Sequence, residues 1–188
     1  MMRSMVLEFT EDKTCGYLAT QYMLGDSLLV APIFNDQSMA EYYLPEGRWT
    51  SVLTGEEKQG GKWYKEHHGY LSIPLYAREN SIVALGARNV DAVYDYADGV
   101  TLKVYALEDG KTANTVVYNT ENQVELTASV TRNGNVYAID VETGKKCRVE
   151  LVNVGAPTSV ISDYNVCCPD GKNVVVELPG SAEVTVVM

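Results

Sequence analysis

The chain lacks the sequence signatures of several large protein classes. Its apolar runs fall far short of the about 18 residues that a transmembrane helix needs. It has no phosphate-binding loop, no dinucleotide-binding fingerprint, no nucleophile elbow and no zinc-ligand spacing. Lys and Arg never form a cluster larger than two adjacent residues, and the formal net charge is −10. We therefore expect no membrane-spanning segment and no binding to nucleic acid or anionic membranes.

Cysteine is sparse, and its spacing is not that of a disulfide framework. No C-x-x-C pair occurs, and a vicinal pair rarely closes a disulfide with itself. The four cysteines are Cys15, Cys147, Cys167 and Cys168. We predict reduced thiols and a cytoplasmic protein.

Histidine is equally rare, with His67 and His68 as the only pair. Adjacent residues of a strand point to opposite faces, so both side chains cannot readily bind one metal ion. We expect one packed and one exposed histidine, and we predict neither a metal site nor a cofactor site.

What the chain does contain is the composition of an ordinary soluble protein. It has 188 residues, of which 46% are hydrophobic and 21% are charged. This length is sufficient for one large domain or two small ones with a substantial core.

Residues 1–36 differ in pattern from the rest of the chain. A short apolar run at 1–9 precedes a helix-compatible stretch at 13–24 and a continuous apolar run at 27–34, SLLVAPIF. A strand that is apolar throughout is typical of a parallel sheet covered on both faces. The pattern predicts one strand–helix–strand (βαβ) unit, and no later helix extends it. The chain therefore resembles the end of a larger α/β enzyme.

The remaining residues predict strands and turns. In 37–90, short aromatic and β-branched runs, among them 70–73, alternate with Gly- and Pro-containing turns, which favours an antiparallel sandwich. In 91–188, about seven strand-like runs follow one another, with hairpin-type turns expected at 133–135 and 143–145. The predicted fold is mainly β, with modules at 37–90 and 91–188.

Carboxylates and aromatic side chains are the candidates for chemistry. Glu8 ends the first predicted strand and Asp26 precedes the strand at 27–34, but no pair with glycosidase spacing can be identified. We interpret Asp26 as a loop residue and Glu8 as an ion-pair residue. The aromatic residues could form a sugar platform, although core packing would use them as well; they are Tyr42, Tyr43, Trp49, Trp63, Tyr64 and Tyr70.

Three segments resemble those of a known family in their residues and in their order along the chain. They are QYMLGDSLLVAPIF at 21–34, YYLPEGRWTSVLTGE at 42–56 and GYLSIPLYARENSIVALG at 69–86. They resemble the C-terminal part of glycoside hydrolase family 31, most closely its α-xylosidase branch. The resemblance covers residues 1 to about 90, and 91–188 resemble the distal sandwich of the family only in length, position and strand content.

The resemblance implies a retaining enzyme that releases terminal α-linked xylose or glucose. It implies that residues 1–36 are the last strand–helix–strand of a (β/α)8 barrel, and that 37–90 and 91–188 are proximal and distal β-sandwiches. Both catalytic aspartates of the family lie upstream of the matched segments, so we assign no catalytic residue and expect this chain alone to be inactive. The expected partners are the missing catalytic barrel, α-xylosides or α-glucosides for the intact enzyme, and a second copy bound through residues 1–34.

Two alternatives remain open at this point. The chain could be a stand-alone carbohydrate-binding or interaction module, which would need an exposed row of aromatic residues on one sheet face. It could also complete a catalytic part that is encoded as a separate chain.

Overall fold

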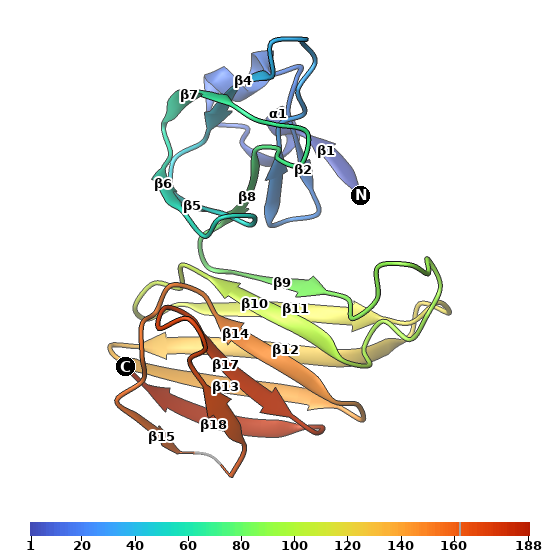
Figure 1. Cartoon of the computed structure of the whole chain (residues 1–188), viewed down its shortest axis with the longest axis vertical. Coiled ribbons are helices and arrows are strands. Elements are labelled where there is room, and N and C mark those ends of the chain that lie inside the picture. The colour runs from blue at the N-terminus through green and yellow to red at the C-terminus, as the bar shows by residue number, and fades with distance from the viewer. Residues whose placement is uncertain (162) are drawn as a thin grey trace. The chain divides into compact units, whose positions relative to one another are not determined.

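The computed structural model describes residues 1–161 and 163–188, and the fold is mainly β (Figure 1). The chain divides into two compact units, Met1–Glu79 and Asn80–Met188. The domain boundaries expected near residues 36 and 90 stay predictions, and each compact unit is described by itself.

The first unit contains two short helical segments and eight of the strands. The helical segments are α1 (Met5–Glu8) and the 3-10 helix η1 (Lys13–Tyr17). The strands are β1 (Met2–Ser4), β2 (Tyr22–Leu24), β3 (Leu28–Val30), β4 (Met39–Leu44), β5 (Arg48–Ser51), β6 (Glu57–Gln59), β7 (Lys62–His67) and β8 (Leu75–Arg78).

These strands form a six-stranded sheet in the order β1-β2-β3-β8-β5-β6 and a two-stranded sheet of β4 and β7. All pairings in this unit are antiparallel. The core lies among large apolar side chains, which include Met5, Met23, Leu29, Tyr42, Leu44 and Trp49.

The predicted βαβ unit at residues 1–36 is wrong in the described structure. β1 pairs antiparallel with β2, and β2 pairs antiparallel with β3. The apolar run at 27–34 contributes only the three residues Leu28–Val30 as a strand. These strands continue into the sheet of β8, β5 and β6, so the structure does not show a remnant of a barrel.

Local chemistry explains why the helix predicted at 13–24 does not form. Asp12 accepts a hydrogen bond from the backbone N–H of Thr14 at 3.0 Å, which caps only a short 3-10 turn. The buried amide of Gln21 then bonds both backbone groups of Tyr43, at 2.7 Å to its oxygen and 2.8 Å from its nitrogen. Gly25, at φ +65°, turns the chain between β2 and β3. A Gly-containing loop between two apolar runs is a hairpin signal.

The strand predicted at 70–73 is also absent from its expected place. Tyr70 and Leu71 are fully exposed, and the strand begins only at Leu75. The carbonyl oxygen of Pro74 accepts a hydrogen bond from the N–H of Ala31 at 3.0 Å. This bond directly precedes the first paired residue of β8, Leu75, which is opposite Val30 of β3. Pairing with β3 therefore selects the strand, rather than the local apolar pattern.

The other ten strands of the described residues lie in the second unit. They are β9 (Ser81–Leu85), β10 (Val100–Tyr105), β11 (Thr112–Tyr118), β12 (Val124–Asn133), β13 (Val136–Thr143), β14 (Cys147–Leu151), β15 (Ser159–Ile161), β16 (Asn165–Cys167), β17 (Val174–Leu178) and β18 (Ala182–Val187).

Two five-stranded sheets enclose one hydrophobic core in this unit, with orders β16-β17-β14-β10-β9 and β11-β12-β13-β18-β15. β13 alternates strictly between exposed and buried residues, as a half-buried strand should. Residues of both sheets share the core, among them Leu102, Val149, Val176, Leu126, Ile139 and Val184. One pairing, β10 with β14, is parallel.

One of the two predicted hairpin turns is confirmed and the other is wrong. Gly134, at φ +59°, joins β12 and β13, which pair antiparallel from Asn133 with Val136 onward. Gly144 instead connects β13 of one sheet with β14 of the other. The Gly signal marks a reversal in both places, but it does not reveal that the chain changes sheets.

Candidate functional site

The structure brings Glu8 and Asp26 together, within an ion cluster of the first unit. The other members of this ion cluster are two arginines, Arg3 on β1 and Arg78 on β8. Glu8 lies 3.3 Å from Arg3 Nη1 and 2.7 Å from Arg78 Nη1 through its two carboxylate oxygens. Arg3 also pairs with the carboxylate of Asp26, and Arg78 donates to the backbone oxygen of Asp26 at 3.3 Å.

This geometry supports the interpretation of Glu8 as an ion-pair residue and of Asp26 as a loop residue. Asp26 sits in the turn between β2 and β3. Both carboxylates are engaged by guanidinium groups, whereas a catalytic acid or nucleophile must face a substrate. The ion pairs and hydrogen bonds of the cluster instead connect α1 and the β2–β3 turn to β8.

A second cluster of the first unit surrounds the ammonium group of Lys58 on β6. Its side chain is only 5% exposed, and it pairs with Glu66 of β7. The Nζ atom lies 3.2 Å from Tyr42 Oη, and it lies 4.8 Å and 5.4 Å from the ring centroids of Tyr64 and Tyr76. Because β6 and β8 belong to one sheet and β4 and β7 to the other, the Lys58 cluster joins the two sheets.

The hydrogen bonds of the Lys58 cluster decide its charge state. Burial opposes the charge of Glu66, but hydrogen bonds from Lys58 and Tyr42 outweigh it, and the pKa of Glu66 is lowered. Burial likewise opposes the charge of Lys58, yet Glu66 and Tyr76 hold its pKa above the ordinary value. Burial and then the bond to Glu66 raise the pKa of Tyr42. At neutral pH Lys58 and Glu66 are therefore an ion pair, next to the neutral phenol of Tyr42.

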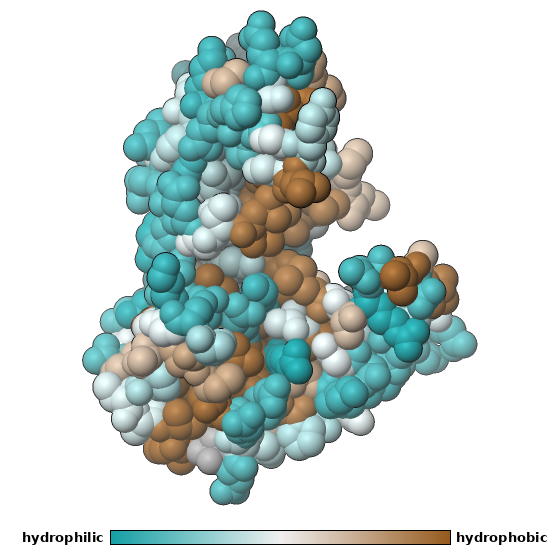
Figure 2. All heavy atoms as spheres, in the orientation of Figure 1, coloured by the Kyte–Doolittle hydropathy of each residue, from teal (hydrophilic) through white to brown (hydrophobic). Residues whose placement is uncertain are grey.

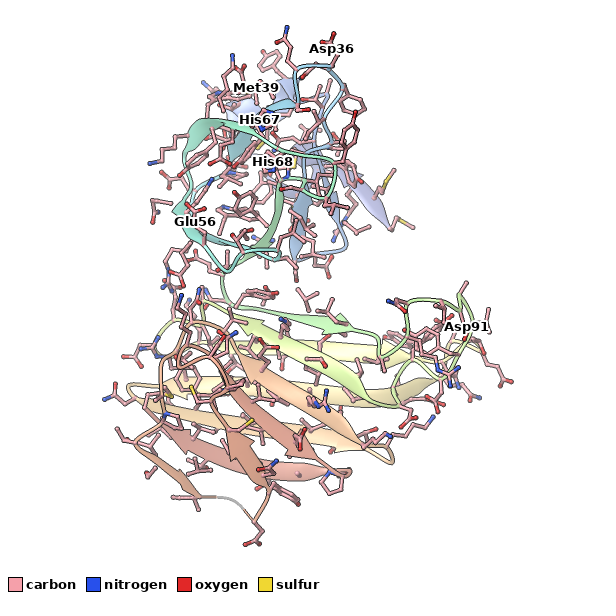
Figure 3. All side chains as sticks on the ribbon, viewed as in Figure 1. Asp36, Met39, Glu56, His67, His68 and Asp91 are labelled. Carbon is pink, nitrogen blue, oxygen red and sulfur yellow. The ribbon has the colours of Figure 1, made fainter. Side chains whose placement is uncertain are left out.

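The histidine pair lies at the end of β7 (Figure 3). His67 is exposed, while the side chain of His68 is 13% exposed, which confirms one packed and one exposed histidine. His68 Nδ1 lies 2.8 Å from Ser72 Oγ, and His68 Nε2 lies 3.8 Å from Glu66 Oε2. His68 also lines a pocket of about 520 Å³ together with Asn35 and Tyr70.

Most of the candidate aromatic residues are used in packing. Trp49, Tyr42 and Tyr43 are buried, and Trp49 Nε1 donates to the oxygen of Pro45 at 2.8 Å. Trp63 is 53% exposed, with its ring tilted against Tyr43. A row of aromatic residues on one exposed sheet face, which a stand-alone sugar-binding module would need, is not formed by these six residues.

The thiols and carboxylates of the described residues do not gather into a metal site: no group of three or more His, Cys, Asp or Glu side chains there has suitable geometry. All four cysteines are free. Burial raises the pKa of Cys147 to about 11, and burial with the nearby charge of Asp12 raises that of Cys15 to about 12.

The cytoplasmic location stays a prediction. Within the described part of the chain, no helix has the length and apolarity to span a membrane.

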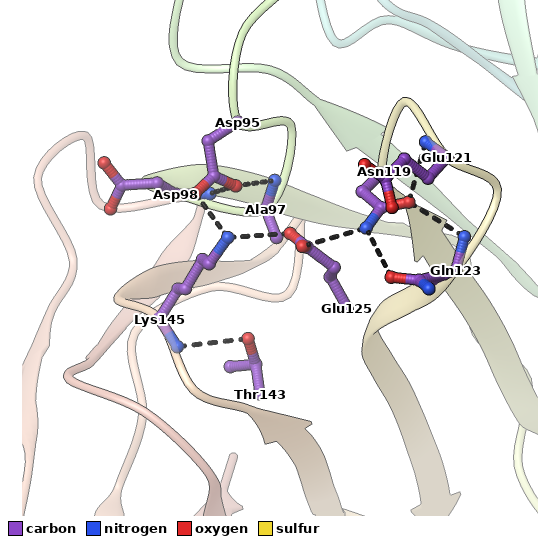
Figure 4. Close-up of polar contacts among 9 residues, drawn as sticks. All are labelled: Asp95, Ala97, Asp98, Asn119, Glu121, Gln123, Glu125, Thr143 and Lys145. Atoms are coloured by element: carbon purple, nitrogen blue, oxygen red, sulfur yellow. Dashed lines mark hydrogen bonds and ion pairs between the residues drawn. The ribbon is translucent and has the colours of Figure 1, made fainter.

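A polar network of the second unit holds the loop between β9 and β10 (Figure 4). Lys145 pairs with Asp95 of this loop and lies 2.7 Å from Glu125 Oε2. Asp95 accepts hydrogen bonds from the N–H groups of Ala97 and Asp98 at 3.3 Å. The bond to Lys145 lowers the pKa of Asp95 below its ordinary range.

Sequence reasoning named Glu8, Asp26, the histidines and the aromatic residues, but it missed Lys58, Glu66 and Lys145 as network residues. Their partners lie in other strands or in the loop between β9 and β10, at sequence separations of 8 to 50 residues. Lys58 lies in the wholly polar strand β6, so no apolar pattern marks it as a buried residue.

Comparison with protein families matches both units. Residues 1–83 match the profile described as the glycosyl hydrolase family 31 C-terminal domain. Residues 95–188 match the profile described as the C-terminal domain of the α-xylosidase YicI. The second match covers half of the chain.

Curated relatives include α-xylosidases much longer than this chain. The α-xylosidase XylQ of Lactiplantibacillus pentosus is 45% identical over 120 residues, which are 62% of this chain and 16% of the relative. An α-xylosidase of Emericella nidulans is 37% identical over 55% of this chain and 14% of its own length. The chain thus spans about a sixth of these relatives.

Solved structures share the fold over the whole chain. A family 31 dextranase of Flavobacterium johnsoniae, in complex with glucose, has a TM-score of 0.87 at 17% identity, and the match covers 100% of this chain and 29% of that one. A cycloalternan-forming enzyme of Listeria monocytogenes has a TM-score of 0.85 at 22% identity, and the match covers 100% of this chain and 20% of that one.

The two profile matches show that the chain belongs to glycoside hydrolase family 31, and it corresponds to the C-terminal domains of the α-xylosidase-like members.

Proposed function

We propose that this chain is the accessory C-terminal part of a retaining α-glycosidase that removes terminal α-xylosyl or α-glucosyl residues. The observation that carries the proposal is that two C-terminal family profiles match in succession, over residues 1–83 and 95–188. The curated α-xylosidases have most of their length outside the matched region. The reaction chemistry is therefore assigned to the remainder of the enzyme.

The role of the chain in such an enzyme is structural. The ion cluster connects residues 1–34 to β8 through ion pairs among Arg3, Glu8, Asp26 and Arg78. The Lys58 cluster joins the two sheets of the same unit. We propose that the N-terminal segment contacts the catalytic barrel. Residues 1–34 carry exposed apolar side chains that such a contact would cover, namely Met1, Met2, Val6, Leu7, Tyr17, Leu24 and Phe34.

A chimera tests the proposal. The 188 residues would replace the equivalent segment of the Lactiplantibacillus pentosus α-xylosidase, and hydrolysis of p-nitrophenyl α-xyloside and α-glucoside would be measured. We expect turnover by the chimera, no turnover by this chain alone, and no turnover by the relative truncated before the matched segment.

Two outcomes would overturn the proposal. Turnover by the isolated chain would show that it carries catalytic groups, and Glu8 and Asp26 would then be the first residues to replace. A chimera that folds, as judged by circular dichroism and gel filtration, yet stays inactive would show that this chain cannot serve as the accessory part of such an enzyme.

A further inference from the structure

A pocket of about 650 Å³ lies on the outer side of the sheet β16-β17-β14-β10-β9 in the second unit. This volume falls within the range of small-molecule sites. The polar side chains in its wall are Lys146, Arg148, Asp163, Tyr164, Asn165 and Glu177. None of them belongs to the ion cluster or the Lys58 cluster of the first unit.

Three of these side chains form a row across neighbouring strands. Arg148 of β14 is directly opposite Glu177 of β17, and Glu177 is opposite Asn165 of β16. All three are exposed. The alternate residues of β14 and β17 are buried in the core, and Val166 of β16 packs partly buried against it. Residues opposite one another on a sheet keep their side chains on the same face.

Hydrogen bonds hold this row in place. Arg148 Nε donates to Glu177 Oε1 at 3.2 Å, and Asn165 Nδ2 donates to Glu177 Oε2 at 3.0 Å. The bond from Arg148 uses one of the five N–H donors of a guanidinium group, and Asn165 also has a carbonyl acceptor. The row thus presents fixed donors and acceptors next to each other at the pocket.

The charges of the wall cancel. Lys146 and Arg148 carry two positive charges, and Asp163 and Glu177 carry two negative charges. A pocket without net charge favours a neutral polar ligand over a phosphate, since phosphate sites gather Arg and Lys. Tyr164 adds a partly buried aromatic ring, and Pro179 adds apolar surface. A sugar combines hydroxyl edges with apolar C–H faces and matches this wall.

We propose that the pocket binds a neutral oligosaccharide, with Arg148, Asn165 and Glu177 bonding its hydroxyl groups and Tyr164 contacting a ring face. This ligand class rests on the proposed function, because a glycosidase works among such glycans. The site would hold a glycan chain on the accessory part, apart from the reaction itself. The same pocket in a chain that is not part of a glycosidase would still be a neutral polyol site.

Titration of the 188-residue chain tests the proposal. Maltotriose, isomaltotriose and an α-xylosyl-glucose disaccharide would be added separately, with inorganic phosphate as the anionic comparison, and binding would be followed by calorimetry and by amide chemical shifts. We expect dissociation constants of about 1 mM or below for at least one sugar. The shifts should concentrate on Arg148, Asn165 and Glu177.

Matched substitutions connect binding to the pocket. Glu177→Gln should weaken sugar binding about tenfold, the effect of losing a hydrogen bond to a charged group. Asn165→Ala should weaken it about fivefold, the effect of losing a hydrogen bond between neutral groups. Glu142→Gln is the control, because Glu142 is an exposed glutamate of β13 in the other sheet, bonded to Thr127 at 3.3 Å. Its sugar affinity should not change, and the thermal unfolding of all three variants should stay close to that of the parent chain.

Three results would overturn the proposal. They are the absence of sugar binding, sugar binding that Glu177→Gln and Asn165→Ala leave unchanged, and binding of phosphate in place of the sugars. None of them bears on the activity of the chimera, so failure of this inference and failure of the proposed function are distinguishable.

Discussion

Lys58 shows how one polar residue can organise a protein interior. Its side chain is almost fully buried, and its charge is balanced by Glu66 and faced by three tyrosine rings. Removing one member of such a pair leaves the other charge without its partner, which costs more than removing both. The ammonium of Lys58 is therefore more important to stability than that of a surface lysine.

The substitution Lys58→Met should lower the free energy of unfolding by about 2 kcal/mol, a value below that of a fully buried pair because Glu66 is one-third exposed. Urea denaturation at pH 7 measures the change. Lys65→Met is the matched control, since Lys65 and Glu41 form an exposed pair at 3.6 Å and should contribute at most about 0.5 kcal/mol. An equal loss in both variants would contradict the structural role of the Lys58 cluster.

The pH dependence of stability follows from the same pair. Glu66 has a lowered pKa, so its contribution is complete above its ordinary value of 4.5 and is lost as the pH falls through its folded pKa. Lys58 has a raised pKa, so its contribution is complete below 10.5 and is lost as the pH rises further. Urea denaturation from pH 3 to 11 should show the gap between the parent chain and Lys58→Met narrowing at both ends.

At the scale of the secondary-structure element, the turn between β6 and β7 depends on a close approach of two backbone segments. Gly60 donates its N–H to the oxygen of Gly47 at 2.8 Å. A Cβ atom at Gly60 would lie 1.7 Å from the carbonyl oxygen of Pro45. Any side chain there forces the two turns apart, because a backbone atom cannot rotate away.

Gly60→Ala should therefore destabilise the first unit by about 2 kcal/mol or more, measured as a shift of the thermal or urea midpoint. Gly69→Ala provides the control, because a Cβ atom at Gly69 meets nothing within 4 Å. We expect a change within about 0.5 kcal/mol for this control. A harmless Gly60→Ala substitution would show that the two turns are not packed as described.

The loop between β9 and β10 is an element held by charge. Lys145 holds this loop through its ion pair with Asp95. The loop residues Val90 and Val93 are exposed, and hydrophobic surface is visible at the loop in Figure 2. Lys145→Met should increase amide hydrogen exchange in residues 91–98 several-fold at pH 7. Lys111→Met, at an exposed lysine between β10 and β11, should leave it unchanged. Unchanged exchange in both variants would contradict the fastening role.

The pKa shifts define where this fastening persists. The pKa of Asp95 lies below 3.8, so the contact is complete above that pH and weakens as Asp95 becomes protonated. The pKa of Lys145 is raised by its bonds to Asp95 and Glu125, so the contact persists up to at least pH 10.5. Protection of the loop in the parent chain should therefore fall only in acid or in strong base.

At the scale of the whole molecule, the exposed apolar side chains of residues 1–34 predict self-association when no barrel covers them. Sedimentation analysis of the isolated chain should show a dimer or a larger assembly. The double variant Leu7→Ser and Phe34→Ser should shift it toward monomer, whereas Leu71→Ser, a fully exposed leucine outside this segment, should not. A monomeric parent chain would argue against an oligomer formed through residues 1–34.

The sequence by itself determined the strand content and the family. Alternation of polar and apolar residues in β10 and β12 is a local signal, because neighbouring side chains of a strand face opposite sides. The motifs at 21–34, 42–56 and 69–86 are local as well, and they pointed to glycoside hydrolase family 31, which the family comparisons show.

Only the tertiary structure decided which strands pair and which polar groups meet. The apolar pattern of residues 1–36 does not distinguish a parallel βαβ unit from the antiparallel strands β1, β2 and β3. The Gly144 turn gives no sign that β14 pairs in parallel with β10. Glu8 and Arg78, 70 residues apart, meet because β1, β2, β3 and β8 are neighbours in one sheet of the first unit. Such contacts depend on backbone hydrogen bonds and burial between distant segments, which no local pattern encodes.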